Sequence, residues 1–287
     1  MMRHPVLAQV CGSNFAYQHH SLERCLDDMV ELGRTKVELW GIAPHLHIPD
    51  ADGRRVKNVL NLLRERELSV ACLTPEQVAY PVNIASGERW LREGSVQLFL
   101  RAAEICSDLE SPLLFLTAGR GYEDEPLEPA WERSVLALQA ITERASELGV
   151  SCVLEPLQRL ESNLVTDLSS LGRMVEDVGH PDLGVVIDTV ASAVAGDAIS
   201  DYGKSFGKRV RHIHLIDGSP AGHLAWGDGN LDLTSILHDL GQLEYKESIT
   251  FELFGDGSYS LDPRSSYQKC LDAFVDSAAQ LQQAHCR

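Results

Sequence analysis

Four short apolar runs in the second half of the chain decide the fold: SCVLE (151–155), LGVVID (183–188), RHIHL (211–215) and SITFE (248–252). Unbroken apolar runs of this length are typical of parallel strands that are buried on both faces. Each run has a side chain that can bind a metal at or near its C-terminal end: Glu155, Asp188, His214 and Glu252. These four residues are spaced by 33, 26 and 38 positions, which fits one strand followed by one helix.

Apolar runs alternate with segments of helical spacing along the whole chain. Strands are predicted at 5–11, 35–40, 68–73, 111–117, 151–155, 183–188, 210–215 and 248–253. Helices are predicted at 21–32, 52–67, 86–109, 129–148, 167–178, 190–206, 233–240 and 263–284. Ser21 is a predicted N-cap, and Gly33 and Gly149 are predicted helix stops. Eight strand–helix units predict a single (β/α)8 barrel domain over residues 1–287.

A doubly wound open sheet is the alternative to a barrel. That fold normally has a glycine-rich turn after its first strand. Here the turn reads CGSNFAYQHH (11–20) and contains one glycine, so the barrel is preferred.

Charge and composition limit the partners of the protein. The chain has 25 Lys and Arg against 42 Asp and Glu, a net charge of −17, which argues against a nucleic-acid partner because such binding neutralises phosphates with cations. No apolar run of about 18 residues is present, so no membrane span is expected. The seven cysteines are scattered without a CxxC pair and predict reduced thiols in a cytoplasmic protein.

The strand ends predict a metal site. In a (β/α)8 barrel the C-terminal ends of the strands meet at one face, and a carboxylate buried there is costly unless it is paired or coordinated. Glu155, Asp188, His214 and Glu252 therefore predict one divalent cation: Mn²⁺, Mg²⁺ or Co²⁺, with Zn²⁺ also admitted by the imidazole. His212 shares the strand and face of His214 and is an alternative ligand. Isolated polar strand ends that face water are the simpler alternative.

The loops after the strands contain aromatic, histidine and carboxylate side chains that suit a ligand with many hydroxyl groups. The candidates for substrate binding are Trp40, His45, Glu76, Glu161, His212 and His223. Rim packing is the alternative for Trp40 and also for Trp226, while a solvated loop is the alternative for His45 and His223. A buried structural role is the alternative for His212.

Several of these stretches resemble a known family. They are VELWGIAPHLHIPD (37–50), TPEQVAYPVN (74–83), LEPLQRLESN (154–163), VIDT (186–189), RHIHLID (211–217) and the H…GDG loop (223–229). Together they resemble the xylose-isomerase-like barrels, which include sugar epimerases and isomerases, and within them the fructoselysine 3-epimerase branch. The resemblance implies that the metal ligands are Glu155, Asp188, His214 and Glu252, and that Glu161 contacts substrate hydroxyls.

The resemblance implies a metal-dependent isomerase that inverts C3 of a ketose or ketosamine. The C3 hydrogen of a ketose is acidic because its loss gives an enolate, whose charge a cation can stabilise. Glu155 and Glu252 are predicted to flank C3 as base and acid. Free-ketose epimerases have a histidine three residues after the metal aspartate, where this chain has Ala191, so a sugar joined to an amine is the expected substrate.

Four alternatives to this activity remain at the level of sequence: an epimerase of free ketoses, another sugar isomerase or dehydratase, a sugar-binding barrel without catalytic activity, and a phosphodiesterase of the apurinic endonuclease type. The last must bind a polyanion, which the charge of −17 opposes. The resemblance also predicts a homo-oligomer.

Overall fold

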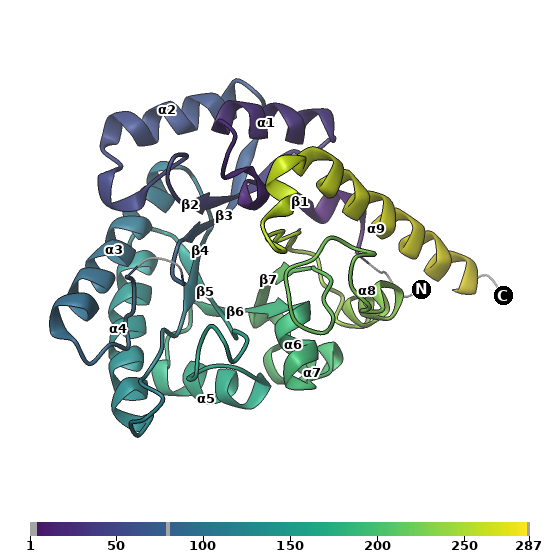
Figure 1. The fold of residues 1–287 in the computed structure, drawn as a ribbon. Helices are drawn as coiled ribbons and strands as arrows, with labels where there is room; N and C mark the ends of the chain where they lie inside the picture. The colour runs from purple at the N-terminus through teal and green to yellow at the C-terminus, as the bar shows by residue number, and fades with distance from the viewer. Residues whose placement is uncertain (1–4, 79–80, 286–287) are drawn as a thin grey trace.

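The computed structural model describes residues 5–78 and 81–285, and its eight parallel strands close into a barrel (Figure 1). In barrel order the strands are β1 (Val10–Ser13), β2 (Lys36–Gly41), β3 (Ser69–Pro75), β4 (Leu113–Thr117), β5 (Ser151–Glu155), β6 (Leu183–Asp188), β7 (Val210–His214) and β8 (Ser248–Thr250). Each strand pairs in parallel with the next, and β8 pairs with β1. The predicted (β/α)8 barrel is confirmed.

Helices surround the strands on the outside of the barrel (Figure 1). They are α1 (Leu22–Glu31), α2 (Gly53–Arg64), α3 (Arg89–Asp108), α4 (Glu128–Glu147), α5 (Leu168–Val178), α6 (Thr189–Ala195), α7 (Ile199–Phe206), α8 (Leu233–Gln242) and α9 (Pro263–His285). Short 3-10 helices occur at η1 (Leu7–Gln9), η2 (Phe15–Tyr17), η3 (Ile48–Asp50), η4 (Gly207–Arg209) and η5 (Ser258–Leu261). In α1, for example, Leu22, Cys25, Leu26 and Met29 are buried at helical spacing, so the helix packs its apolar face on the barrel.

The predicted start and stop signals have the expected geometry. The Ser21 hydroxyl accepts a hydrogen bond from the Arg24 amide at 3.2 Å and caps α1. Gly33 and Gly149 lie just after α1 and α4 with φ of 71° and 74°, a left-handed conformation that glycine adopts without a Cβ clash.

Two predicted elements differ from the structure in more than the positions of their ends. The predicted first strand at 5–11 is instead η1 followed by β1, because the Gln9 amide bonds locally to the Val6 carbonyl at 2.9 Å. The predicted helix at 190–206 is divided into α6 and α7. Gly196 ends α6 in the left-handed region with φ of 79°, and the chain turns before α7 begins.

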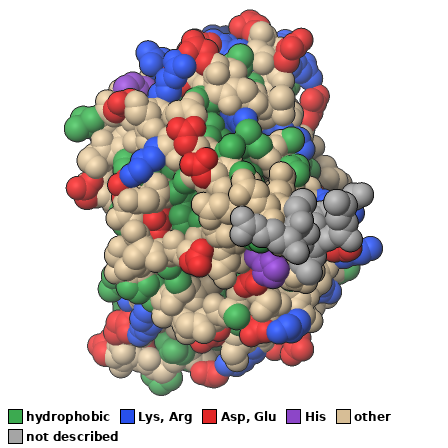
Figure 2. All heavy atoms as spheres, turned by 90° about the vertical axis from the view of Figure 1, so that its right-hand side faces the viewer, with side chains coloured by type: hydrophobic (Ala, Val, Ile, Leu, Met, Phe, Trp, Pro, Cys, Tyr) green, Lys and Arg blue, Asp and Glu red, His purple; other side chains and the backbone are tan. Residues whose placement is uncertain are grey.

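The surface carries charges of both signs. On the face in Figure 2, acidic and basic side chains are interspersed with apolar ones over the part of the chain that is described. Among the residues described, no helix has both the length and the apolar character that a membrane span requires.

Candidate metal centre and active site

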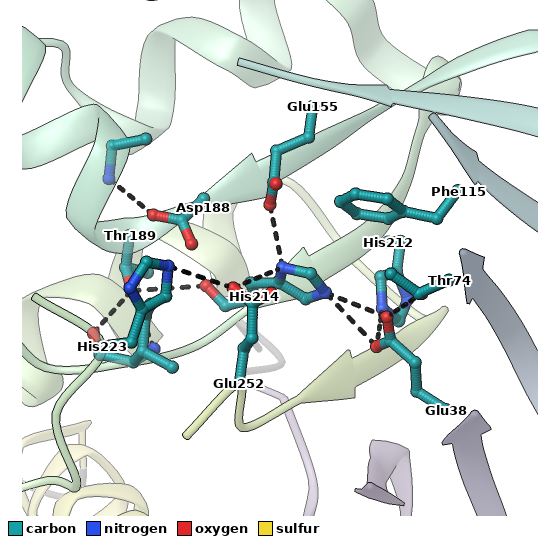
Figure 3. Close-up of polar contacts among 12 residues, drawn as sticks. Glu38, Thr74, Phe115, Glu155, Asp188, Thr189, His212, His214, His223 and Glu252 are labelled. Carbon is teal, nitrogen blue, oxygen red and sulfur yellow. Dashed lines mark hydrogen bonds and ion pairs between the residues drawn. The ribbon is translucent and has the colours of Figure 1, made fainter. Parts of the chain in front are cut away.

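Four side chains from neighbouring strand ends meet at one point of the barrel (Figure 3). Glu155, Asp188 and His214 are the last residues of β5, β6 and β7, and Glu252 lies two residues beyond β8. One donor atom from each lies within 4.8 Å of the other three. The functional groups of such barrels lie at the C-terminal ends of the strands. These four residues, one strand–helix unit apart in the sequence, therefore lie together in space.

The donor atoms of this cluster converge without forming hydrogen bonds to one another. His214 Nδ1 lies 2.8 Å from Glu155 Oε1 and 3.2 Å from Glu252 Oε2. These three atoms and Asp188 Oδ2 are buried, and none has a hydrogen-bond partner of acceptable geometry. Buried polar atoms are nearly always satisfied, so four that face a common centre call for another partner. Three carboxylates and one imidazole fit a divalent cation, whose bonds to such ligands are about 2.0–2.3 Å long.

Asp188 also caps the helix that follows its strand. Its Oδ1 accepts a hydrogen bond from the Ala191 amide at 2.5 Å and caps α6, while its Oδ2 faces the cluster. The cap fixes the carboxylate, because one oxygen is held by the helix that follows the strand.

Burial and mutual charge shift the pKa values of this cluster in opposite directions. Burial raises the pKa of Glu155 well above its ordinary value, despite the neighbouring His214. Burial acts on Glu252 in the same sense, but the positive charges of His214 and His223 outweigh it and lower its pKa to about 2. The pKa of His214 is raised well above its usual range, because the surrounding carboxylates outweigh the opposing effect of burial. Burial and neighbouring charges therefore favour the protonated forms of Glu155 and His214 and the ionised form of Glu252.

Glu38 is a charged residue next to this centre that the sequence analysis did not predict. It lies inside β2, is fully buried, and accepts hydrogen bonds from Nε2 of His212 at 2.6 Å and Nε2 of His214 at 3.1 Å. The Thr74 hydroxyl donates to the same carboxylate (Figure 3). A glutamate in the middle of the buried strand KVELWG is the signal that could have revealed it, because an isolated buried carboxylate is costly.

The structure places His212 in the buried position that was the alternative to substrate binding. His212 was expected to bind substrate, but its side chain is fully buried and its Nε2 is occupied by Glu38. His214, by contrast, has the nitrogen that faces the three carboxylates. Glu38, Cys72 and His212 also lie close enough to hold an ion. However, burial raises the pKa of Cys72 well above its ordinary value and keeps it a thiol, which is a poor ligand.

A cavity of about 400 Å³ opens above the cluster. Glu155, Glu161, His223 and Glu252 form a polar part of its wall. An aromatic part adjoins it, where the rings of Phe15, Trp40 and Phe254 pack on one another with centroids 5.1–5.6 Å apart. The cavity thus offers charged groups at its floor and an apolar wall beside them, as ligand sites commonly do.

The structure brings four of the six predicted substrate residues to this cavity. Trp40, Glu76, Glu161 and His223 line it. The Trp40 indole nitrogen donates to Glu76 Oε2 at 3.0 Å, and His223 Nε2 lies 3.3 Å from Glu252 Oε2. Burial opposes protonation of His223, but Glu252 and its neighbours outweigh this and raise its pKa to about 9.

His45 and Trp226 are buried instead of lining the cavity. His45 was predicted to bind substrate, but its ring nitrogens contact the Asn14 side chain and the His20 carbonyl, each at 2.8 Å. A buried imidazole needs such partners, and these leave neither nitrogen for a ligand. The Trp226 indole donates to the Leu215 carbonyl at 3.0 Å, which is a packing role.

Residues 26–276 match the family described as the xylose isomerase-like TIM barrel. The chain belongs to this family. Its relatives include the fructoselysine 3-epimerase of Escherichia coli O157:H7, 26% identical over 92% of this chain and 94% of the relative. The L-ribulose 3-epimerase of Methylomonas sp. (strain DH-1) is 27% identical over 74% of this chain and 70% of the relative. The prediction of an isomerase-type enzyme is confirmed at the level of class, because these relatives are named 3-epimerases.

Solved structures agree on the fold. The structure of a D-allulose 3-epimerase from Methylomonas sp. matches with a TM-score of 0.79 and 20% identity, covering 96% of this chain and all of the other. The D-psicose 3-epimerase of Clostridium cellulolyticum H10, solved with D-tagatose, matches with a TM-score of 0.77 and 17% identity over 94% and 98% of the two chains. At this level of identity the likeness extends to the fold alone.

In this xylose isomerase-like barrel, hydrogen bonds of two asparagines connect the loops around the cavity. Asn83 belongs to TPEQVAYPVN (74–83) and Asn163 to LEPLQRLESN (154–163). Asn83 accepts a hydrogen bond from the Arg120 amide at 3.0 Å and donates to its carbonyl at 2.8 Å. Asn163 likewise accepts a hydrogen bond from the Gly121 amide at 2.8 Å and donates to the Gly121 carbonyl at 3.0 Å. These two motifs therefore join the loops after β3, β4 and β5 to each other. Residues 79–80 of the first motif lie outside the described part of the chain.

One buried aspartate organises the loop that carries His223. The Asp217 carboxylate accepts hydrogen bonds from four loop amides at 2.8–3.0 Å: Gly218, Gly227, Gly229 and Leu231. The His223 carbonyl accepts from the amides of Phe254 and Gly255, just after Glu252. These contacts hold the loop of His223 beside the chain segment that carries Glu252.

Proposed function

We propose that the protein is a divalent-metal-dependent epimerase that inverts C3 of a ketose or ketosamine. The observation that supports this most strongly is the convergence of two glutamates, an aspartate and a histidine at the floor of a cavity, with both glutamates in its lining. A site of this kind offers a cation and two proton-transfer groups to one ligand. Epimerisation next to a carbonyl requires both.

Glu155, Asp188, His214 and Glu252 are the residues that would hold the cation. Their ligand atoms favour Mn²⁺, Mg²⁺ or Co²⁺, and the imidazole admits Zn²⁺. When bound, a divalent cation supplies Lewis-acid stabilisation of the negative charge that develops on substrate oxygens. In the same proposal Glu155 and Glu252 exchange the C3 proton, one removing it from one face and the other returning a proton to the opposite face.

The charges of the cavity support an amine-bearing substrate. Glu76, Glu155, Glu161 and Glu252 face it, whereas His223 is the one basic side chain among its described lining residues. A cation in the cluster offsets only part of this negative charge, so an ammonium group is favoured over a phosphate or carboxylate. A relative that matches over 92% of this chain and 94% of its own length is named for fructoselysine. We therefore infer a ketosamine, a fructose-like sugar joined through C1 to an amine.

The test compares kcat/KM for fructoselysine, other fructosamines, free fructose, tagatose and psicose. A ketosamine preference of about tenfold to a thousandfold is expected at a partly open site that pairs a charged group. Equal or better use of a free ketose would contradict the ketosamine assignment and favour the second candidate, a free-ketose epimerase. The similarity to an L-ribulose 3-epimerase supports this second candidate. The absence of C3 inversion with every sugar would contradict both.

Replacing Asp188 with Asn should weaken metal binding. The substitution leaves a neutral oxygen where a charged ligand is expected, while an amide oxygen can still cap α6. We expect binding of Mn²⁺ to weaken about tenfold or more, because divalent cations such as Mg²⁺ and Mn²⁺ prefer carboxylate oxygen. Elemental analysis after equal metal loading and dialysis measures this, and equal retention by the variant and the parent would remove Asp188 from the ligand set.

Metal binding should release protons and tighten as the pH rises. The pKa values of Glu155 and His214 are raised, so each keeps its proton to a higher pH than an ordinary carboxyl or imidazole group does. A ligand must lose its proton to coordinate, and each proton released makes the apparent affinity rise about tenfold per pH unit. Calorimetry between pH 6 and 8 in buffers of different ionisation heats counts the protons. An affinity that is constant over this range would contradict the assignment of these two ligands.

We also propose a homo-oligomer in the cytoplasm. The six cysteines of the described chain are free and buried, which supports a reducing compartment. Light scattering should give a mass that is a multiple of 31.6 kDa. A mass equal to that of one chain would contradict the oligomer.

A further inference from the structure

Glu38 contacts the metal cluster through His214 and is not among the described residues that line the cavity. Its carboxylate comes from β2, whereas the two histidines that it binds are on β7, and all three side chains are fully buried inside the barrel (Figure 3). No carboxylate would be stable there without close partners. Glu38 has three, namely His212, His214 and the Thr74 hydroxyl.

The chemistry of a carboxylate decides which ring nitrogens carry hydrogen. An ionised carboxylate can only accept hydrogen bonds, so each nitrogen in contact with it must donate. Nε2 of His214 lies 3.1 Å from Glu38 Oε1 and 3.3 Å from Oε2, and therefore carries a hydrogen whether the ring is neutral or charged. Nδ1 is then the nitrogen that can give a lone pair to a metal. It is also the nitrogen that lies 2.8 Å from Glu155 Oε1.

The ring of His214 is also held in its plane. Phe115 stacks on it with a centroid distance of 5.0 Å and an interplanar angle of 16°, and Phe15 meets it edge-on at 6.0 Å. Stacking fixes the plane but not which edge of the imidazole faces the carboxylates. The hydrogen bond to Glu38 supplies that choice, because a flipped ring would place carbon against the buried charge.

We propose that Glu38 is a positioning residue that keeps the hydrogen of His214 on Nε2 and so aims Nδ1 at Glu155, Asp188 and Glu252. This inference rests on the proposed metal site and adds a residue that acts on it through His214. Partners that orient a metal-binding histidine typically contribute about 10- to 100-fold to metal affinity. His212 completes the arrangement by donating to the other oxygen of Glu38, at 2.6 Å.

Two variants of Glu38 test the proposal. Glu38→Met has a similar length and accepts no hydrogen bond from either ring, and Glu38→Gln keeps the shape but removes the charge. Both should bind Mn²⁺ about 10- to 100-fold more weakly than the parent by calorimetry. Cys72→Ala is the matched control, since Cys72 lies in the same buried cluster without donating to Glu38. It should bind one ion per chain with the parent affinity.

A second readout follows the ring hydrogens directly. In protein labelled with [¹⁵N]histidine, metal-free or loaded with Mg²⁺, the Nε2–H signals of His212 and His214 should be far downfield and protected from exchange. Cys72→Ala should keep these signals and Glu38→Met should lose them. A change in stability alone would not move a hydrogen from one ring nitrogen to the other.

Three results would overturn the proposal. The first is a parent protein in which His214 carries hydrogen on Nδ1 only. The second is parent metal affinity in both Glu38 variants, which would leave the metal site intact and remove Glu38 from it. The third is an equal loss of bound ion in Cys72→Ala and Glu38→Gln, which would assign Glu38, Cys72 and His212 to an ion site of their own. If the parent binds no ion at all, the proposed function fails, while the Nε2–H signals still decide the orientation of His214.

Discussion

Replacing Glu155 or Glu252 with Gln should abolish turnover while the barrel stays folded. Each glutamine has the shape of the glutamate but cannot accept or return a proton at C3. Proton transfer by a positioned group contributes about 10²- to 10⁴-fold to the rate, and loss of a charged metal ligand should add to this. The fold should survive, because glutamine has almost the same volume as glutamate and leaves the packing of the barrel unchanged. Circular dichroism checks the fold, and a coupled assay measures the rate.

Glu161→Gln is the control for this pair. Glu161 lines the same cavity but lies outside the set of four ligands. Its variant should retain metal and lose activity mainly through a higher KM. A rate near that of the parent in Glu155→Gln or Glu252→Gln would remove that glutamate from the mechanism.

Replacing Glu76 with Gln should reduce the preference for an amine-bearing sugar. Glu76 lines the cavity, and its carboxylate is oriented by the Trp40 indole and by the Val78 amide at 2.7 Å. Without its charge, kcat/KM for fructoselysine should fall by about tenfold to a hundredfold, since a charged partner is lost. The value for a free ketose should change by less than about threefold on the same principle, because such a sugar has no ammonium group.

Trp40→Phe separates the charge of Glu76 from its orientation. Phenylalanine keeps a ring beside Phe254 but cannot donate to Glu76. Its effect should have the same direction as that of Glu76→Gln and be smaller. An equal loss for fructoselysine and free fructose in Glu76→Gln would show that Glu76 acts on the sugar and not on the amine.

The residues at the strand ends were the most useful part of the sequence for predicting the site. Glu155, Asp188 and His214 close apolar runs, and the alternation of strands and helices predicts a barrel that places such ends together. The preference for His214 over His212 followed from its position nearer the strand end. In physical terms, successive strands of a closed barrel leave little freedom at their C-terminal ends, so local pattern is enough to bring these residues together.

Contacts across the barrel could not be predicted in the same way. Glu38 and His212 are 174 residues apart and meet only because β2 and β7 both point these side chains into the interior. His45 was misplaced for a related reason: the loop after β2 turns its ring inward, toward Asn14 and the His20 carbonyl. Sequence composition shows that a loop contains a histidine, but not which way the ring faces.

Isotope exchange at the substrate carbon tests the central claim most directly. A ketosamine or ketose is incubated with the metal-loaded protein in D₂O and followed by proton and carbon NMR. We expect deuterium to enter at C3 as the C3 epimer appears, with no deuterium at C4, and we expect Glu155→Gln and Glu252→Gln to lose this exchange. Inversion without deuterium at C3, or deuterium at another carbon alone, would contradict proton transfer at C3 by these two glutamates.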